Sequence, residues 1–325
     1  MDGTFVRSRL IEPKVMRGLT RRADLPGLIQ AGSHFGAIFA TGTGLWLTWG
    51  TWWAVPFFVA HGVLINFLYA AQHELSHGTP FKTPKLNVWL GRVVGFLMLY
   101  PRDFDQIQHT AHHKWTQDWA RDGELAREPY TLRSYLLWFL GPTYWYSRIA
   151  RLVRLTRGIV LEPYIRPDQE AQVIREARIH MALYGALAAM SVALQTWAVV
   201  ILWLAPMLAT KVFHQLQNTI EHLGLSHEDN ILENTRSTRT NAFMRWMCWN
   251  MQYHTAHHAF PAVPFHRLRE LNQEMTEGAG TPPHSMGYLE FQAQVIAKLW
   301  RAKSEADYPY DEVWITPEGG RVPLD

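Results

Sequence analysis

The stretch TWWAVPFFVAHGVLINFLYAAQHELSH, residues 51–77, decides the fold. Its apolar part is about 20 residues long, the length that crosses the hydrocarbon core of a bilayer as a helix. The motif HELSH, residues 73–77, follows without a break, so we expect it to be helical as well. His73 and His77 then lie four residues apart on one helix face, where two imidazoles can bind one metal ion.

Two further histidine clusters point to the same chemistry. The pentapeptide HTAHH stands at 109–113 and again at 254–258, and the flanking sequences do not match, which excludes an internal repeat. On a helix, adjacent side chains diverge by about 100°, so His112 and His113 could serve different metal ions. The full set of clustered histidines beyond the first motif is His109, His112, His113, His254, His257 and His258.

The apolar residues are concentrated in two blocks, at about 34–71 and 179–217. Each block divides into two pieces of about 17–20 residues joined by a short uncharged turn, and Trp residues stand near the turns. We therefore predict an all-α integral membrane protein with four transmembrane helices in two hairpins. The alternative for the second block is a pair of buried helices in a soluble core, in which such a long apolar run is rare.

Two hairpins return the chain to its starting side, so all the polar segments share one face of the membrane. These segments carry nearly all the Arg and Lys residues, which makes that face cytoplasmic by the positive-inside rule. All three histidine clusters fall there too, which predicts a cytoplasmic histidine-rich cap. The stretches 86–100 and 134–150 read as interfacial helices that lie against the bilayer.

This reading divides the chain into three parts and places it in a membrane. We predict a cytoplasmic N-terminal arm at 1–32, a membrane domain at 33–300 and a polar C-terminal tail at 301–325. The expected location is a bacterial inner membrane with the metal site on the cytoplasmic side. Residues 1–30 do not read as a signal peptide, because no apolar core follows their basic residues.

Composition excludes several other classes of protein. The 325 residues include 48% apolar and 18% charged residues, 15 Trp and a mean hydropathy of −0.14, so the apolar residues must be clustered. The net charge of +3 and the lack of any nucleic-acid-binding signature exclude DNA and RNA as partners. Cys248 is the only cysteine, which excludes a disulfide framework and a thiolate metal site.

Eight clustered histidines exceed the four ligands of one zinc ion, but they suit two ions of five or six coordination. The motif QNTIEH, residues 217–222, adds Asn218 and His222 at helical spacing, where the apolar block ends. Glu74 and Glu221 lie inside the motifs and could bind a metal directly. We instead expect the carboxylates near the clusters to accept hydrogen bonds from imidazole N–H groups and so orient the rings. These carboxylates are Glu74, Glu221, Asp118, Asp122 and Glu124.

The remaining histidines have less specific surroundings. We expect a structural role for His34, His61, His180 and His284, and a supporting or structural role near the clusters for His214, His227 and His266.

The three motifs, in this order around two membrane hairpins, resemble the histidine boxes of the integral-membrane fatty acid desaturase and hydroxylase superfamily. The resemblance covers about residues 35–272. QNTIEH resembles the asparagine/histidine site between the second and third boxes of acyl desaturases, and HHAFPAVPFHRLRELN, residues 257–272, resembles the segment after the third box.

The resemblance implies two iron ions, O2 as co-substrate, and a lipid or fatty acyl substrate. The implied ligands are the eight box histidines, His222 and Asn218. Asn218 and the segment after the third box favour desaturation; hydroxylation and oxidative decarboxylation to an alkene are the alternatives. A non-catalytic metal transporter or sensor is the competing class, although a transporter should bury its polar ligands within the spans.

No fused cytochrome b5-like domain is visible, so electrons would come from a separate donor with its reductase. The donor would be a ferredoxin, a rubredoxin or a cytochrome. The basic residues Arg148, Arg151, Arg154 and Arg157 could dock an acidic donor or lipid headgroups, or could form an ordinary juxtamembrane belt.

Overall fold

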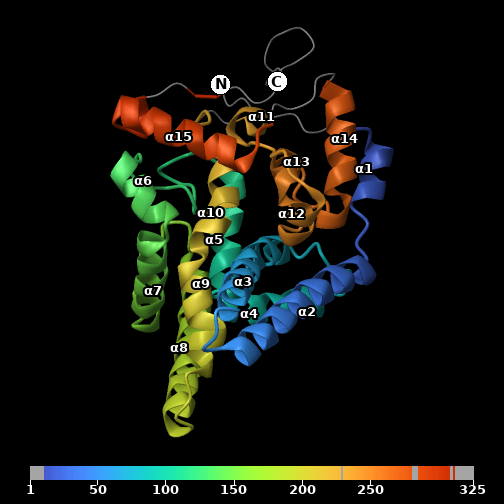
Figure 1. Cartoon of the computed structure of the whole chain (residues 1–325). Coiled ribbons are helices and arrows are strands. Elements are labelled where there is room, and N and C mark those ends of the chain that lie inside the picture. The colour runs from blue at the N-terminus through green and yellow to red at the C-terminus, as the bar shows by residue number, and fades with distance from the viewer. Residues whose placement is uncertain (1–10, 228–229, 280–284, 308–309, 312–325) are drawn as a thin grey trace.

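The chain folds into helices, and a long connection at 115–131 separates α5 from α6 (Figure 1). The computed structural model describes residues 11–227, 230–279, 285–307 and 310–311. Within these residues there is no strand, and a single isolated β-bridge joins Thr238 and Met286. The prediction of an all-α fold is therefore confirmed. The prediction for His284 and most of the tail at 301–325 lies outside the described residues.

The first apolar block forms the expected hairpin. After α1 (Pro13–Leu19), the helices α2 (Asp24–Thr48) and α3 (Ala54–His77) pack along each other. Gly50, with φ of +87°, turns the chain between them, and Trp52 at the turn is 90% exposed. The helix α2 begins inside the segment 1–32 that was expected to be an arm. Among the described residues, α3 alone is both long and apolar enough to cross a membrane, whereas the sequence predicted four such helices.

The second apolar block is less regular than expected. Its first helix, α8 (Pro167–Ala193), starts well before 179 in a charged segment. After the turn, the predicted single helix is divided into a π-helix η2 (Val200–Leu204), α9 (Ala205–Ala209) and α10 (Lys211–Ile220).

A side chain of α3 stabilises the break between α9 and α10. The amide Nδ2 of Asn66 donates to the carbonyl oxygen of Met207 at 2.8 Å and to Oγ1 of Thr210 at 3.1 Å. A carbonyl that a broken helix leaves without its usual partner thus gains a new donor. Pro206, which has no N–H, removes one regular helical hydrogen bond at the earlier junction of η2 and α9.

Four shorter helices surround the two hairpins. The prediction of one interfacial helix at 134–150 is wrong in detail, because the chain breaks at Gly141, whose φ is +105°, just before Pro142. A proline starts a helix readily, and glycine tolerates the left-handed backbone before it. The four helices are α4 (Pro84–Leu97), α5 (Arg102–Lys114), α6 (Leu132–Phe139) and α7 (Pro142–Thr156).

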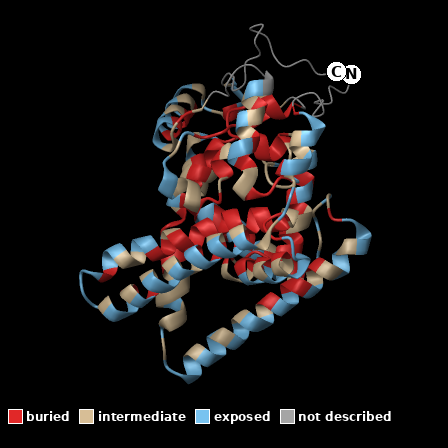
Figure 2. Ribbon diagram, turned by 90° about the vertical axis from the view of Figure 1, so that its right-hand side faces the viewer, coloured by how far each residue is buried: buried red, intermediate tan, exposed pale blue. Residues whose placement is uncertain are grey.

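The C-terminal part of the chain forms a cap at one end of the hairpins (Figure 1). Buried residues concentrate where the cap meets α3, and the long helices expose much of their surface (Figure 2). Trp249 is fully buried there, and its ring centroid lies 5.0 Å from that of Phe265. The cap contains α11 (Ile231–Asn234), α12 (Ala242–Met247), η3 (Met251–Tyr253), α13 (His254–Ala259), η4 (Phe265–Arg267), α14 (Leu268–Ala279), α15 (Tyr288–Ala302) and η5 (Glu305–Asp307).

Candidate metal centre

Nine histidine side chains meet in two groups at the junction of hairpins and cap. They come from the C-terminal end of α3, from α5, from the residue that follows the C-cap of α10, and from α13. Within each group the candidate ligand atoms all lie within 4.8 Å of one another. The first group contains His73, His77, His109, His113 and His257, and the second contains His112, His222, His254 and His258.

Helix geometry explains how the motifs divide between the groups. His112 and His113 fall into different groups because adjacent side chains on α5 point about 100° apart. His257 and His258 divide in the same way on α13. The groups adjoin, since the rings of His113 and His258 stack with centroids 4.1 Å apart.

In the first group the Nε2 atoms face one another. His77 Nε2 lies 2.8 Å from His109 Nε2 and 3.1 Å from His257 Nε2. His73 Nε2 lies 2.8 Å from His257 Nε2, and His113 Nε2 lies 3.0 Å from His109 Nε2. Neighbouring nitrogen ligands of one ion, each about 2.1 Å from the metal, are separated by about 3 Å. The spacing in this group matches such a ligand set.

The second group has the same spacing. His222 Nε2 lies 2.9 Å from His254 Nε2 and 3.2 Å from His112 Nε2. His258 Nε2 is buried and has no hydrogen-bond partner among the described residues. A buried nitrogen without a partner is costly in a folded protein, and a metal ion would provide the partner.

Carboxylates contact the outer nitrogens of four rings. His109 Nδ1 donates to Glu124 at 2.7 Å, and His112 Nδ1 lies 3.0 Å from both oxygens of Asp122. These contacts fix the proton on Nδ1 and leave the Nε2 lone pair directed at the group. Two more carboxylates lie slightly farther away: Glu74 is 3.3 Å from His257 Nδ1, and Glu221 is 3.5 Å from His254 Nδ1.

Two further rings are oriented by groups that the sequence did not indicate. His222 Nδ1 lies 3.1 Å from the backbone oxygen of Asn234, and His258 Nδ1 lies 3.3 Å from Oγ1 of Thr116. A backbone oxygen leaves no mark in a sequence. Thr116 stands three residues after a histidine box, which is a weak signal.

Two residues named from the sequence make other contacts. Asp118 accepts from the Arg121 side chain and from the Ala120 N–H, and so lies at the surface and away from the rings. Asn218 is on α10, one turn before His222, and lies close enough to the Glu221 carboxylate to lower the pKa of that group against the larger effect of burial.

The electrostatic environment keeps most of these rings neutral. Burial, together with the smaller effect of a charged His112, lowers the pKa of His257 to about 3. Burial likewise holds the pKa of His258 well below the usual 6.5. Burial disfavours the charged form of the His112 ring, but the Asp122 carboxylate more than offsets the effect of burial and raises the pKa of His112 to about 9. A neutral ring is the form that binds a metal.

The histidines outside the boxes hold the surrounding structure together. His34 Nε2 lies 2.9 Å from the backbone oxygen of Leu64, and His61 Nε2 lies 2.7 Å from that of Leu202. Three others make contacts within their own helices: His180 contacts Tyr184, His214 contacts Lys211, and His266 lies edge-on to Phe265. His227 contacts the Gln117 backbone in a distant loop.

The fold and the site together define a helical protein with a two-part, histidine-rich candidate metal centre. The chain belongs to the fatty acid desaturase family, whose profile matches residues 36–290. This family is membrane-associated, and its members are oxidoreductases that act on lipids. The histidine groups fit the metal binding expected of such enzymes.

Several characterised relatives are desaturases. The chain is similar to the sn-1 acyl-lipid omega-3 desaturase (ferredoxin) of Synechocystis sp., with 25% identity over 69% of this chain and 67% of the relative. It is similar to the sn-1 oleoyl-lipid 12-desaturase of Picosynechococcus sp., with 19% identity over 79% and 77%. The sphingolipid delta(4)-desaturase of Drosophila melanogaster shares 24% identity over 73% and 70%.

Proposed function

We propose that this protein is a di-iron, O2-dependent desaturase of a fatty acyl chain or a similar lipid. One observation carries the proposal: nine imidazoles form two adjoining groups with ligand-like spacing, in a chain of the fatty acid desaturase family. Imidazole is a common ligand of iron, and no thiolate competes, since Cys248 is buried as a free thiol outside both groups.

The residues of the site have distinct tasks in this proposal. The five rings of the first group would hold one iron, and the four rings of the second group would hold the other. Asn218 would contribute directly or through water. When bound, the two irons would use O2 and two electrons to oxidise an unactivated C–H bond, which side chains alone cannot do. Asp122 and Glu124 hold His112 and His109 in position, and the buried surroundings exclude bulk water.

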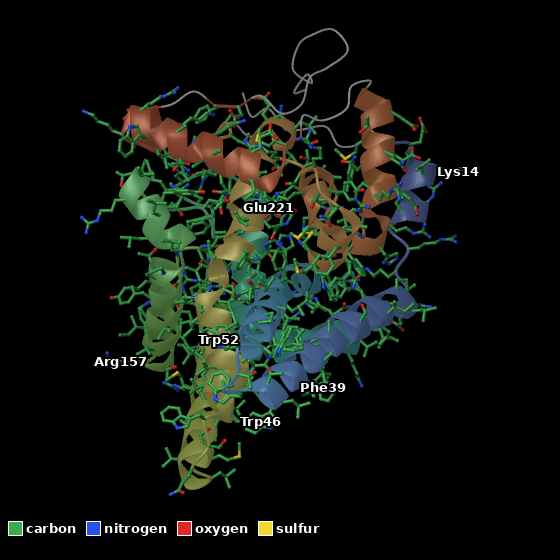
Figure 3. All side chains as sticks on the ribbon, viewed as in Figure 1. Lys14, Phe39, Trp46, Trp52, Arg157 and Glu221 are labelled. Atoms are coloured by element: carbon green, nitrogen blue, oxygen red, sulfur yellow. The ribbon has the colours of Figure 1, made fainter. Side chains whose placement is uncertain are left out.

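We propose further that both hairpins lie in a membrane, with the histidines at its cytoplasmic face. The two turns expose aromatic side chains: Trp53 at the first turn is 73% exposed, and Trp197 at the second turn is 73% exposed. Phe39, Trp46 and Trp52 point outward at the end away from Glu221 (Figure 3). Such aromatic side chains favour a membrane interface over water.

A separate redox protein would deliver the electrons. This part of the proposal rests on a relative, the omega-3 desaturase of Synechocystis sp., whose name specifies ferredoxin. A rubredoxin or a cytochrome is the alternative donor.

Lipid analysis of a host that expresses the protein tests the proposal. Cells with the wild-type chain should accumulate a lipid lighter by two hydrogens, and cells with His257→Ala should not. A gain of one oxygen would instead indicate hydroxylation, and release of carbon dioxide with a terminal alkene would indicate decarboxylation. Purified protein should contain about two irons per chain. Zinc in place of iron, with no altered lipid, would favour a transporter and contradict the proposal.

A further inference from the structure

A turn in the long connection between α5 and α6 supplies one carboxylate to each histidine group. Asp122 accepts from His112 of the second group, and Glu124 accepts from His109 of the first group. The two acids stand only two residues apart, yet the structure holds their side chains in place by different means.

The Asp122 carboxylate is fixed by the backbone of the turn itself. Its Oδ1 atom accepts from the N–H groups of Glu124 at 2.8 Å and Leu125 at 3.0 Å. Its Oδ2 atom accepts from the Gln117 N–H at 2.9 Å, and the side chain is fully buried. Backbone donors on both oxygens fix the orientation of this acceptor without help from any other side chain.

The Glu124 carboxylate has no such backbone donors. Its side chain is 17% exposed. Among the described residues, its oxygens accept only from His109 Nδ1 at 2.7 Å and from the Tyr69 hydroxyl at 3.1 Å. A glutamate side chain rotates about several bonds, so an acceptor that is partly open to water needs a second contact to stay against the ring. Tyr69 provides that contact.

Tyr69 is itself held firmly by three helices. It lies on α3 one turn before His73, whose ring belongs to the first group. Its ring meets that of His214 on α10 edge-on, with centroids 5.1 Å apart. The guanidinium carbon of Arg148 on α7 lies 5.5 Å from the centroid of the Tyr69 ring. The residue is only 9% exposed, so its hydroxyl is a fixed donor.

We propose that Tyr69 is a positioning residue for the first metal position, because its hydroxyl holds the Glu124 carboxylate against Nδ1 of His109. A ring that donates from Nδ1 to a fixed carboxylate keeps its Nε2 lone pair for the metal. In His109 this Nε2 atom lies 2.8 Å from Nε2 of His77, within the first group. The inference rests on the metal binding proposed above, but it requires no particular lipid substrate.

Retention of iron against a chelator tests this role. Purified full-length protein is loaded with Fe(II) without oxygen, and the chelator concentration that removes half of the iron is measured. Glu124→Ala should lower that concentration about 10- to 100-fold, and Tyr69→Phe, which removes only the hydroxyl, about three- to tenfold. Tyr184→Phe is the control, because it removes a hydroxyl of α8 that donates to the Phe96 backbone outside both groups. This control should match the wild type.

Double variants separate positioning from a general structural role. If Tyr69 acts through Glu124, Tyr69→Phe should cause no further loss of iron in the Glu124→Ala background. Its effect should persist in the Glu221→Gln background, which alters the carboxylate near His254 of the second group.

Two results would overturn the assignment of Tyr69 alone. One is wild-type retention of iron in Tyr69→Phe, and the other is an equal loss from Tyr69→Phe with and without Glu124. A wild-type chain that binds no iron at all would overturn the proposed function first, and this assignment with it.

Discussion

The Nε2 atom of His73 lies 2.8 Å from the Nε2 atom of His257, although 184 positions separate the two residues in the chain. One ring stands at the end of α3 and the other on α13, in the cap. The candidate metal centre therefore exists only when the first hairpin and the cap have docked. Metal binding and docking of the cap should accordingly stabilise each other.

Removing a histidine of the second group should empty the metal position of that group and spare the metal position of the first group. We expect His258→Ala to lower the iron content of purified protein from about two towards about one per chain, since His258 contributes to that group alone. Elemental analysis measures this. His180→Ala, which alters a buried histidine of α8 outside both groups, serves as the control. A full iron complement in His258→Ala would contradict the assignment.

Substitution of the two aspartates after the second box should have very different effects on metal affinity. Asp122→Asn weakens the acceptor of His112 Nδ1, so metal affinity should fall about 10- to 100-fold. Asp118→Asn is the matched control four residues earlier, and it should leave affinity unchanged because Asp118 contacts Arg121. Competition with a chelator of known affinity gives both values. Equal losses of metal affinity in the two variants would show that the hydrogen bond to His112 is not the cause of the loss.

The metal-free protein should lose stability in acid. Burial lowers the pKa of His257 to about 3 and holds the pKa of His258 well below 6.5. These rings are neutral when folded but take up protons when unfolded, so protons favour the unfolded chain below about pH 6.5. The unfolding temperature of chelator-treated protein should drop between pH 7 and pH 5. An unchanged temperature over that range would mean that the rings are not buried in the neutral form.

His112 should make the metal-free protein lose stability as the pH rises, which is opposite to the effect of His257 and His258. Its raised pKa of about 9 means that the folded state holds a proton that the unfolded chain releases near pH 6.5. The contribution of His112 to the stability of the folded state is complete below about pH 6.5 and is lost as the pH rises through 9. In the metal-free protein, His112→Gln should therefore flatten the decline in unfolding temperature between pH 7 and pH 9.

The proposed topology predicts which positions face outward. The wild-type chain has one cysteine, Cys248, which is buried, so single introduced cysteines can be labelled selectively. In bacterial spheroplasts, Trp52→Cys and Trp197→Cys should react with a membrane-impermeant maleimide. Lys303→Cys, after α15, should react only once the membrane is permeabilised. Labelling of Lys303→Cys in sealed spheroplasts would place the cap outside the cytoplasm and contradict the proposed topology.

The sequence alone predicted the helical fold and the nine histidines that meet in the candidate site. Apolar runs of helical length end at histidine motifs, and the i, i+3 and i+4 spacing puts imidazoles on one helix face, so both features depend on short-range geometry. The grouping of His112 apart from His113 also follows from local geometry. All nine histidines singled out from the sequence as ligands belong to the two groups.

Only the tertiary structure decided the features that depend on contacts between segments far apart in the sequence. The break between α9 and α10 is stabilised by Asn66 from another helix, and His222 is oriented by a backbone oxygen of Asn234, which no sequence pattern marks. The same holds for Arg148 and Lys211. Each looks like an ordinary basic residue in the sequence, and only the tertiary structure shows that both are buried. Long-range packing fixes burial, and burial determines the energetic consequence of a charge.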